Sequence, residues 1–329
     1  MGEAVDQLRN LPAGSVVTLG NFDGVHLGHQ ALLSHARDEA RRRGTRVIAV
    51  TFERHPLAVL KPEAAPLRLT PPDLRRELLT ACGADEVVVL QPTPELLSLE
   101  AEDFFALLSR EARVGHLVEG ESFCFGRQRR GTIGRLREWT AATGMGLTVV
   151  PSVHVGLLDR TEVPVSSSLI RTLAQLGRVR DAGICLGRPL VLVGRVVQGF
   201  RRGRTLGFPT ANLDCVGHVV PADGVYAGRC TLGATTYPAA IHIGPLPTFG
   251  SQPRQIEVHL IGFDGDLYGQ VLQMEVLDFL RDGRKFASVE MLRARLAVDV
   301  RQAEAVSRFT HLFQPSSPPR AVVLTGRDN

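Results

Sequence analysis

Two histidines, His26 and His29, are the first side chains of this 329-residue chain whose types and spacing suggest chemistry. They end a stretch that reads Gly20-Asn21-Phe22-Asp23-Gly24-Val25-His26-Leu27-Gly28-His29. Glycines let the backbone turn sharply and approach a ligand closely, and a helix starting at about His29 adds partial positive charge. Imidazoles on one side of such a turn donate hydrogen bonds to phosphate oxygens as charge builds during transfer. The pattern therefore predicts a phosphate-binding turn.

Zinc ligation is the alternative interpretation of the two histidines. Neither a Glu-x-x-His arrangement nor a cysteine partner stands near His26 and His29, so the stretch departs from the usual zinc patterns. Packing alone also explains two histidines among three glycines poorly, although a glycine-rich turn by itself is weak evidence.

Residues 194–212 mix glycines with arginines, Arg204 among them, and end in Gly207-Phe208-Pro209-Thr210-Ala211-Asn212. A cationic loop of this kind can cover phosphates, while Thr210 and Asn212 offer neutral oxygens that Mg²⁺ accepts alongside ATP. A solvated basic loop or an RNA-contacting loop is the alternative. RNA contact would require stacking aromatics, and Phe200 and Phe208 are the ones present. The stretch predicts a second nucleotide site.

The first half of the chain alternates short β-branched runs with helical patterns, which implies a parallel sheet covered on both faces. We expect strands at residues 16–19, 46–52, 87–90, 116–119 and 147–150. We expect helices at residues 29–43, after Pro71 and Pro72, and at residues 166–176 and 179–186.

The second half has closely spaced strand patterns separated by glycine, proline and Asp-Gly turns, which predicts an antiparallel β-barrel. The expected strands are residues 190–197, 224–231, 239–243, 255–261 and 270–277, followed by a helix at about 288–309. We therefore predict one domain over residues 1–186, a second over 187–313, and a disordered tail over 314–329, which contains Ser-Ser-Pro-Pro.

Composition excludes several classes of protein. Lys plus Arg is 38 against 34 for Asp plus Glu, so the net charge of +4 argues against a polybasic nucleic-acid binder. Five cysteines without a Cys-x-x-Cys pair indicate a reducing compartment. The first twelve residues carry charges, and no run reaches the roughly 18 apolar residues of a membrane span. We expect a cytoplasmic monomer or weak homo-oligomer that binds small molecules, without nucleic-acid or membrane partners.

The stretch from Gly20 to His29 resembles the signature of the nucleotidylyltransferase superfamily, and its full form resembles the bacterial bifunctional riboflavin kinase and FAD synthetase family. Residues 51–56 (Thr-Phe-Glu-Arg-His-Pro), 123–126 (Phe-Cys-Phe-Gly) and 166–171 (Ser-Ser-Ser-Leu-Ile-Arg) resemble the same family, in the same order. The resemblance implies an α/β protein with a Rossmann-like nucleotidylyltransferase domain, followed by a riboflavin kinase β-barrel with a terminal helix.

The resemblance implies that the first domain transfers the adenylyl group of ATP to FMN, giving FAD and pyrophosphate. His26 and His29 would hold the ATP phosphates, and Ser167 and Arg171 would grip the nucleotide's phosphates. A helix cap is the alternative role for the serine cluster. The remaining expected binding residues are Gly20, Asn21, Phe22, Asp23, Gly24, Gly28 and Ser122.

In the second half, Gly207 to Asn212 resembles the Pro-Thr-Ala-Asn signature of riboflavin kinase. We expect Arg204, Gly207, Thr210 and Asn212 to bind the nucleotide, with Thr210 and Asn212 as Mg²⁺ ligands. The resemblance implies that Glu257 would be the general base that takes the proton from the riboflavin 5′-hydroxyl. A carboxylate within an Ile, Val and Leu strand suits this role because partial burial raises its proton affinity. An outward-facing strand glutamate is the alternative.

Four residues depart from the family pattern at expected ligand walls. Ser122 stands where Asp or Asn is usual, His242 where Asn is usual, Leu246 replaces a polar residue and Gly262 replaces Asp. These departures leave open an alternative function, a flavin- or nucleotide-binding regulatory protein with one or both activities weakened. The first motif alone also allows an adenylyltransferase with another acceptor, but the riboflavin kinase motifs argue against it.

Overall fold

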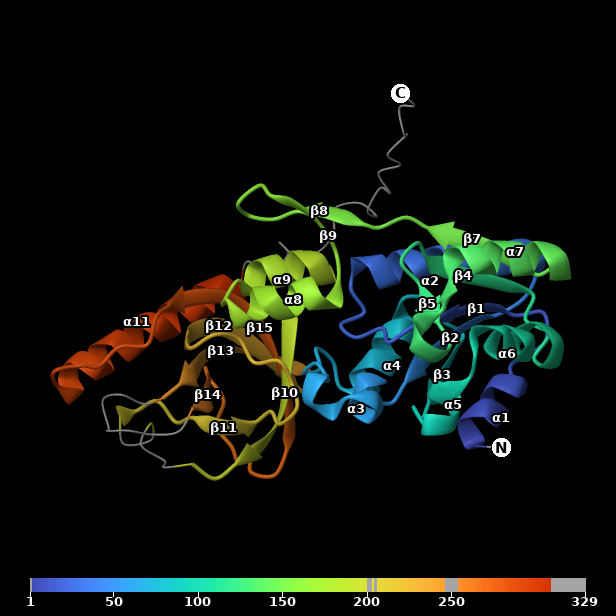
Figure 1. Ribbon diagram of the computed structural model, residues 1–329. Coiled ribbons are helices and arrows are strands. Elements are labelled where there is room, and N and C mark those ends of the chain that lie inside the picture. The colour runs from blue at the N-terminus through green and yellow to red at the C-terminus, as the bar shows by residue number, and fades with distance from the viewer. Residues whose placement is uncertain (1, 200–202, 204–205, 246–253, 309–329) are drawn as a thin grey trace. The chain divides into compact units, whose positions relative to one another are not determined.

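The computed structural model describes residues 2–199, 203, 206–245 and 254–308 (Figure 1). The described chain forms two compact units, the first from residues 2–66 and 71–154 and the second from 67–70 and 155–308. This division by packing falls before the predicted domain boundary at 186/187, because two helices that precede that boundary belong to the second unit. The boundary itself stays a prediction, and the predicted disordered tail at 314–329 lies outside the described residues.

A five-stranded parallel sheet with the strand order β3-β2-β1-β4-β7 forms the centre of the first unit, as the sequence predicts. All four residues of the central strand β1 are buried, because helices cover both faces of the sheet. The strands are β1 (Val16–Leu19), β2 (Val47–Phe52), β3 (Glu86–Leu90), β4 (His116–Gly120) and β7 (Gly146–Val150), with a small pair β5 (Cys124–Phe125) and β6 (Gly131–Thr132).

Two hydrophobic clusters show which helices cover each face of this sheet. The helices α2 and α4 pack through Leu33 and Leu79 on one face, and α1, α6 and α7 pack on the other. The helices are α1 (Glu3–Arg9), α2 (Leu27–Arg43), α3 (Leu57–Leu60), α4 (Pro72–Ala81), α5 (Pro94–Ser98), α6 (Ala101–Ala106) and α7 (Ile133–Thr143), with short turns η1 (Pro62–Ala64), η2 (Leu107–Glu111) and η3 (Arg127–Arg129). The sequence patterns predict α2 and α4 but not α1, α5, α6 or α7.

The strand order reverses between β1 and β4, which defines the topological switch point of the sheet. The two strands pair only through Val16 with His116 and Val17 with Leu117. Ligands of open α/β sheets bind beyond the carboxyl ends of the strands at this point. The segment from Gly20 to His29 follows β1 and therefore starts at that position.

The second unit contains a closed antiparallel barrel with the order β10-β11-β14-β13-β12-β15. Its strands are β10 (Leu190–Val197), β11 (Ala211–Asp214), β12 (Gly224–Leu232), β13 (Thr235–Gly244), β14 (Gln255–Leu260) and β15 (Val271–Arg281). Alternate side chains such as Ile241 and Val258 form the apolar core. The barrel was predicted, although the four-residue β11 was not named as a strand.

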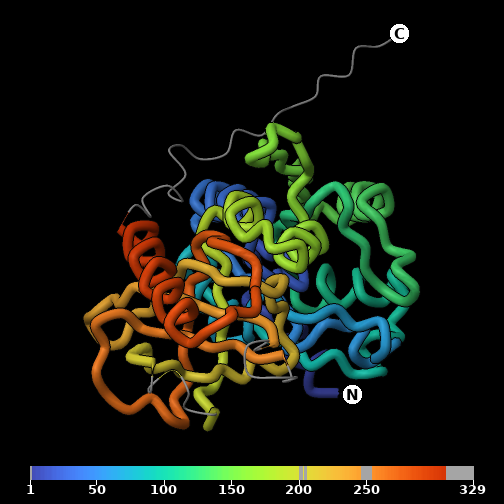
Figure 2. Tube along the Cα trace, turned by 90° about the vertical axis from the view of Figure 1, so that its left-hand side faces the viewer, coloured from blue at the N-terminus to red at the C-terminus, as the bar shows by residue number. Residues whose placement is uncertain are grey.

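Three helices pack on this barrel. The long terminal helix α11 (Val289–Arg308) crosses β12, β13 and β15 (Figure 2). Before the barrel, α8 (Ser167–Gln175) packs on α9 (Val179–Leu186), and α9 packs on β10 and β15. A two-stranded sheet of β8 (His154–Gly156) and β9 (Glu162–Pro164) lies where the two units join in sequence.

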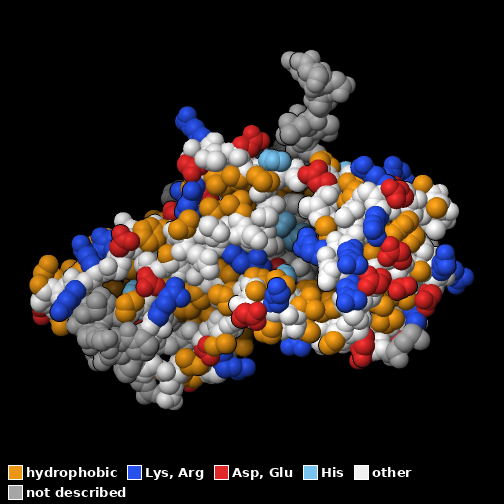
Figure 3. Space-filling model, viewed as in Figure 1, with side chains coloured by type: hydrophobic (Ala, Val, Ile, Leu, Met, Phe, Trp, Pro, Cys, Tyr) orange, Lys and Arg blue, Asp and Glu red, His pale blue; other side chains and the backbone are white. Residues whose placement is uncertain are grey.

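Charges of both signs are interspersed on the face of the molecule in Figure 3, where arginines and lysines alternate with aspartates and glutamates. This mixture accords with the small net charge of +4. Within the described part of the chain, no helix is both long enough and apolar enough to span a membrane.

Candidate active sites

The turn after β1 has an unusual backbone conformation. Phe22 and Val25 have φ angles of 46° and 41°, in the left-handed region that bulky and β-branched residues rarely adopt, and Gly24 between them has φ 89°. The side chains of Phe22 and Val25 are 0% and 1% exposed. Burial of these two side chains offsets the strain, and strained backbone that is so firmly held is typical of functional sites.

His26 and His29 lie side by side on this turn, as predicted. His26 is the N-cap of α2 and His29 is its third residue, so the helix begins two residues before the predicted start. Their rings stack with centroids 3.6 Å apart, and Phe22 packs edge-on against His29 at 5.1 Å. Both imidazoles therefore belong to the N-terminal end of a helix, where unpaired backbone N–H groups favour a bound anion.

The imidazole of His29 is neutral in this environment. Burial lowers its pKa well below the usual value, and the nearby His26 and Arg75 lower the pKa further. No hydrogen-bond partner is present, among the residues described, for the buried His29 Nδ1 or for Asn21 Oδ1. Buried polar atoms in native proteins normally have partners, so these two atoms mark a place for a polar ligand.

Arg75 of α4 is a residue of this site that sequence reasoning missed. Its side chain is buried, with the residue 6% exposed, and it donates to the carbonyl oxygens of Asn21 at 3.0 Å, Glu53 at 3.2 Å and Phe52. The turn after β1 is thereby tied to the end of β2. The available signal was an arginine four residues before Leu79, on the apolar face of the helix.

Glu119 is a second residue that was missed. It lies near the end of β4, 1% exposed, and accepts a hydrogen bond of 2.8 Å from the backbone N–H of Leu19 in β1. Burial raises the pKa of this carboxyl well above its usual range, so the protonated form is favoured in the fold. The buried carboxyl group of Glu119 thus joins the two strands that flank the switch point. A glutamate within an otherwise apolar strand was the signal.

The other predicted residues of this site are distributed over both units. Asp23 and Gly24 are buried in the turn, Gly28 lies in the first turn of α2, and Ser122 is exposed in the loop after β4. Ser167 and Arg171 belong to α8 in the second unit. Their predicted contact with phosphates stays a prediction.

The serine cluster at the start of α8 has a structural role. Ser166 caps the helix by accepting a hydrogen bond of 3.2 Å from the backbone N–H of Leu169. Arg171, one turn further on, donates from Nε to the carbonyl oxygen of Leu67 at 2.8 Å. The cap explains Ser166 and leaves the predicted role of Ser167 to experiment.

A row of directly opposed residues crosses five strands of the barrel in the second unit. Asn212 of β11 pairs with Glu257 of β14, Glu257 with His242 of β13, His242 with Val225 of β12, and Val225 with Arg281 of β15. Directly opposed residues point to the same side of a sheet. The neighbouring positions fill the barrel core, so this row faces outward, where α11 covers the barrel.

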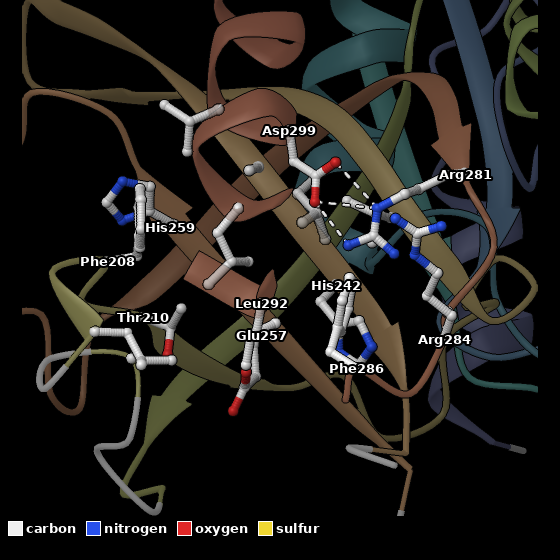
Figure 4. A pocket seen from close by; sticks show the side chains of 18 residues that line it. Phe208, Thr210, His242, Glu257, His259, Arg281, Arg284, Phe286, Leu292 and Asp299 are labelled. Carbon is white, nitrogen blue, oxygen red and sulfur yellow. Dashed lines mark hydrogen bonds and ion pairs between the residues drawn. The ribbon is translucent and has the colours of Figure 1, made fainter. Parts of the chain in front are cut away.

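A cavity of about 120 Å³ lies between this row and α11 (Figure 4). It is lined by Gly203, Leu206, Phe208, Thr210, Val225, Ala240, Ile241, His242, Glu257, His259, Arg281, Gly283, Arg284, Phe286, Leu292, Leu296, Asp299 and Val300. Most of these side chains are apolar or aromatic, and Glu257 and Thr210 supply polar groups at one end of the cavity in Figure 4. Such a lining is typical of a small-molecule site.

The residues predicted to hold Mg²⁺ lie beside Glu257. Thr210 and Asn212 are two residues apart at the start of β11, so they face the same side, and Asn212 is directly opposite Glu257. Among the described residues, no cluster of three or more His, Cys, Asp or Glu could hold a metal. A hydroxyl, an amide and a carboxylate oxygen fit Mg²⁺ that also binds nucleotide phosphates. Gly207 is exposed with φ 86°, and Arg204 lies outside the described residues.

The opposite wall of the cavity is held by arginines. Arg281 pairs with the buried Asp299 of α11, with Nε to Oδ1 at 3.0 Å and Nη2 to Oδ2 at 2.6 Å. The guanidinium carbons of Arg281 and Arg284 lie 5.7 and 5.0 Å from the ring centroid of Phe286. Cation–π contacts and an ion pair thus fix the segment between β15 and α11.

His242 of β13 is a titratable residue that lies directly opposite Glu257 of β14. Burial lowers its pKa, the charge of Arg281 lowers it further, and Asp223 opposes this effect. Within the described chain, its buried Nδ1 atom has no hydrogen-bond partner. A neutral imidazole with an available nitrogen therefore lines the cavity next to the predicted base. Of the other departures from the family pattern, Gly262 is described with φ 79°, and Leu246 lies outside the described residues.

Two protein-family models match the chain in succession, FAD synthetase over residues 8–168 and riboflavin kinase over residues 186–307. The bifunctional riboflavin kinase/FMN adenylyltransferase of Escherichia coli K12 is 36% identical over 288 residues, which cover 87% of this chain and 90% of that protein. The chain belongs to the bifunctional riboflavin kinase/FMN adenylyltransferase family. The relative from Pseudomonas fluorescens is 37% identical over 91% of this chain and 95% of its own length.

A solved structure extends the likeness of this riboflavin kinase/FMN adenylyltransferase family member. The crystal structure described as a macrolide-efflux protein from Streptococcus pneumoniae superposes with a TM-score of 0.79 and 33% identity. It covers 92% of this chain, and 97% of that chain is matched. The likeness therefore includes both the nucleotidylyltransferase-like part and the barrel.

Proposed function

We propose that the chain phosphorylates riboflavin to FMN on its barrel and adenylylates FMN to FAD at the turn after β1, with ATP as the donor in both steps. The observation that carries this proposal is the presence of both sites in one chain, a carboxylate beside Thr210 and Asn212 and a histidine pair at a helix start. Family membership over nearly the whole chain supports the same two reactions.

In the kinase step, the riboflavin 5′-hydroxyl oxygen attacks the γ-phosphorus of ATP. A bond forms between these atoms, the bond from the γ-phosphorus to the bridging oxygen breaks, and ADP leaves. Glu257 accepts the hydroxyl proton, since a half-buried carboxylate at the end of the cavity is a suitable general base. The apolar side chains under α11 shelter the flavin ring from water.

Mg²⁺ is the metal that the oxygen donors beside Glu257 fit. Thr210 Oγ1 and Asn212 Oδ1 would hold the ion together with the phosphates of ATP. The bound ion would supply positive charge that offsets the charge developing on the phosphates. The cation-rich loop that contains Arg204 is proposed to cover these phosphates.

In the adenylyl step, a phosphate oxygen of FMN attacks the α-phosphorus of ATP, the bond from the α-phosphorus to the bridging oxygen breaks, and pyrophosphate leaves. FMN phosphate is already anionic, so this step needs positioning and charge stabilisation more than a base. Neutral His29, together with His26, donates hydrogen bonds to the phosphates at the start of α2. Ser167 and Arg171 are further proposed phosphate ligands.

Product analysis tests both steps in one tube. With riboflavin, ATP and Mg²⁺, chromatography is expected to show FMN first and FAD later. His29→Ala should stop FAD formation and leave FMN formation, whereas Glu257→Gln should stop FMN formation and leave FAD formation from added FMN. A folded protein that makes neither product, or a single variant that abolishes both steps, contradicts the proposal.

A flavin-binding protein without catalysis is not favoured, because the chain matches bifunctional enzymes over about nine-tenths of its length. Calorimetry that detected tight riboflavin binding with no turnover would revive that alternative. A cytoplasmic location, a monomeric or weakly oligomeric state and the absence of nucleic-acid and membrane partners stay predictions.

A further inference from the structure

The turn that carries His26 and His29 is held from a helix far away in sequence. Arg75 of α4 donates to the carbonyl oxygens of Asn21 in the turn and of Phe52 and Glu53 at the end of β2. Thr51 adds a hydrogen bond of 3.1 Å from its hydroxyl to the same Asn21 oxygen. One buried guanidinium group therefore joins the turn to the end of β2, and Thr51 adds a second contact between them.

We propose that Arg75 is a positioning residue of adenylyl transfer, which locks the Asn21 turn onto the end of β2 and whose positive charge acts on the His29 imidazole. The inference rests on the proposed FMN adenylylation and deepens it. Arg75 acts through Asn21 and His29.

The hydrogen bonds of Arg75 explain why an arginine is required to hold the Asn21 turn against the end of β2. A guanidinium group is planar and presents five donors in a fixed fork, so it can join carbonyl groups from two segments at once. A lysine ammonium is a single point donor and cannot hold the same three oxygens in the same geometry. The end of β2 and the turn would then move independently, and a small displacement of a phosphate ligand slows transfer markedly.

The charge explains the second part. The titratable groups that act on His29 are His26, stacked on it at the start of α2, and Arg75 from α4. The hydrogen bonds from Arg75 to Asn21, Phe52 and Glu53 end on carbonyl oxygens, which carry no net charge. Burial is the main factor that disfavours a proton on His29, and the charges of His26 and Arg75 add to this effect. The imidazole is therefore a neutral donor, which releases pyrophosphate more readily than an imidazolium ion would.

Three variants separate the two parts. Arg75→Met removes both the guanidinium fork and the positive charge, whereas Arg75→Lys removes the fork and keeps the charge. Arg76→Met is the matched control at the next position of α4, which is exposed. FAD formation from FMN and ATP and FMN formation from riboflavin and ATP are measured for each protein. The pKa of His29 is measured by NMR titration of protein labelled with ¹⁵N-histidine, with the His29 signal identified by its loss in His29→Gln.

Both Arg75 variants are expected to lose at least about tenfold in kcat for FAD formation, while kcat for FMN formation changes less than about twofold. The His29 pKa should rise in Arg75→Met and stay as low as in the wild type in Arg75→Lys. Arg76→Met should behave as the wild type in all three measurements. If Arg75→Met does not fold, as judged by its melting curve, Arg75→Lys still tests the fork and its titration still tests the charge.

Several outcomes would overturn the inference. If Arg75→Lys makes FAD at the wild-type rate, the forked hydrogen bonds of the arginine are not required. If the His29 pKa is unchanged in Arg75→Met, the charge of Arg75 has no effect on His29. A raised His29 pKa in Arg75→Lys also contradicts the charge effect, since that variant keeps the positive charge. If the wild-type protein makes no FAD, the proposed function fails. If it makes FAD and the Arg75 variants make it equally fast, only the role of Arg75 fails.

Discussion

Glu257 of β14 lies directly opposite His242 of β13, and both side chains line the cavity under α11. The proposed base of the kinase step therefore has an imidazole as its cross-strand neighbour. Opposed residues of an antiparallel pair have their Cβ atoms within about 5.5 Å. At that separation a charge on one side chain changes the proton affinity of the other.

His242→Asn is expected to alter the pH dependence of FMN formation. The pKa of His242 lies below 6.5, since burial and Arg281 disfavour its charged form and Asp223 compensates only in part. As the pH falls through this pKa, an imidazolium ion opposite Glu257 lowers the proton affinity of that carboxylate and weakens it as a base. Wild-type kcat/KM for riboflavin should therefore fall more steeply below pH 6.5 than that of the variant.

The measurement is a series of kcat/KM values for riboflavin between about pH 5 and 8, with FAD formation from FMN as the control in the same proteins. FAD formation should have the same pH profile in both, because His242 and the turn after β1 belong to different units. Superimposable acid limbs for FMN formation would mean that His242 does not influence Glu257.

The stability of the protein is expected to fall as the pH drops below about 6.5. His29, His116 and His242 all have lowered pKa values in the fold, chiefly because burial disfavours their charged forms. The unfolded chain therefore binds protons first, and each such histidine costs up to about 1.4 kcal/mol per pH unit within the window of its shift. Above pH 6.5 this contribution is constant.

Melting temperatures at several pH values between 5 and 8 check this dependence. His116→Gln should weaken it, because a group that favours the unfolded state at low pH is removed. His35→Gln is the control, since His35 lies on the exposed side of α2. A melting temperature that is independent of pH in this window would show that the buried histidines protonate without cost.

The sequence predicts those elements whose buried faces are continuous. The predicted and observed bounds of β1 agree because its four apolar or β-branched residues are buried on both faces. The short helices α1, α5 and α6 have five to seven residues, too few for a helical period to be recognised. Their positions are set by packing on the sheet.

The candidate sites were predictable where the residues are close in sequence and not where they are far apart. His26 and His29 stand three positions apart, so their pairing is readable from the sequence. Arg75 belongs to the site because it donates a hydrogen bond to Asn21, which lies 54 residues before it in the sequence. His242 becomes the neighbour of Glu257 only through strand register, which depends on the whole barrel.

Glu119→Gln is expected to stabilise the first unit at alkaline pH. The pKa of Glu119 is raised in the fold by burial, so the folded chain holds a proton that the unfolded chain has released above pH 4.5. This contribution is fully present below pH 4.5 and is lost as the pH rises toward the folded pKa. Glutamine is uncharged at every pH, and its amide oxygen can still accept the hydrogen bond from Leu19.

Melting curves of wild-type protein and variant at pH 6 and pH 9 test this expectation, with Glu138→Gln on the exposed side of α7 as the control. The advantage of Glu119→Gln should grow with pH and reach about 1 kcal/mol or more. A variant that is destabilised equally at both pH values would mean that the carboxyl proton itself is required.

Gly199→Ala is expected to slow FMN formation and to leave FAD formation unchanged. A Cβ atom at position 199 would lie 2.0 Å from Nδ2 of Asn212 and 2.5 Å from its Cγ, which is closer than any real contact. The amide of Asn212 must then move away from its position opposite Glu257, although the site needs oxygen donors held in place. FMN formation should fall at least about tenfold, with a higher Mg²⁺ concentration needed for half-maximal rate. FAD formation from FMN should be unchanged.

Gly156→Ala is the matched control, since a Cβ atom there meets nothing within 4 Å among the described residues. Normal FMN formation by Gly199→Ala would show that the position of the Asn212 amide does not matter, and would remove Asn212 from the proposed metal ligands.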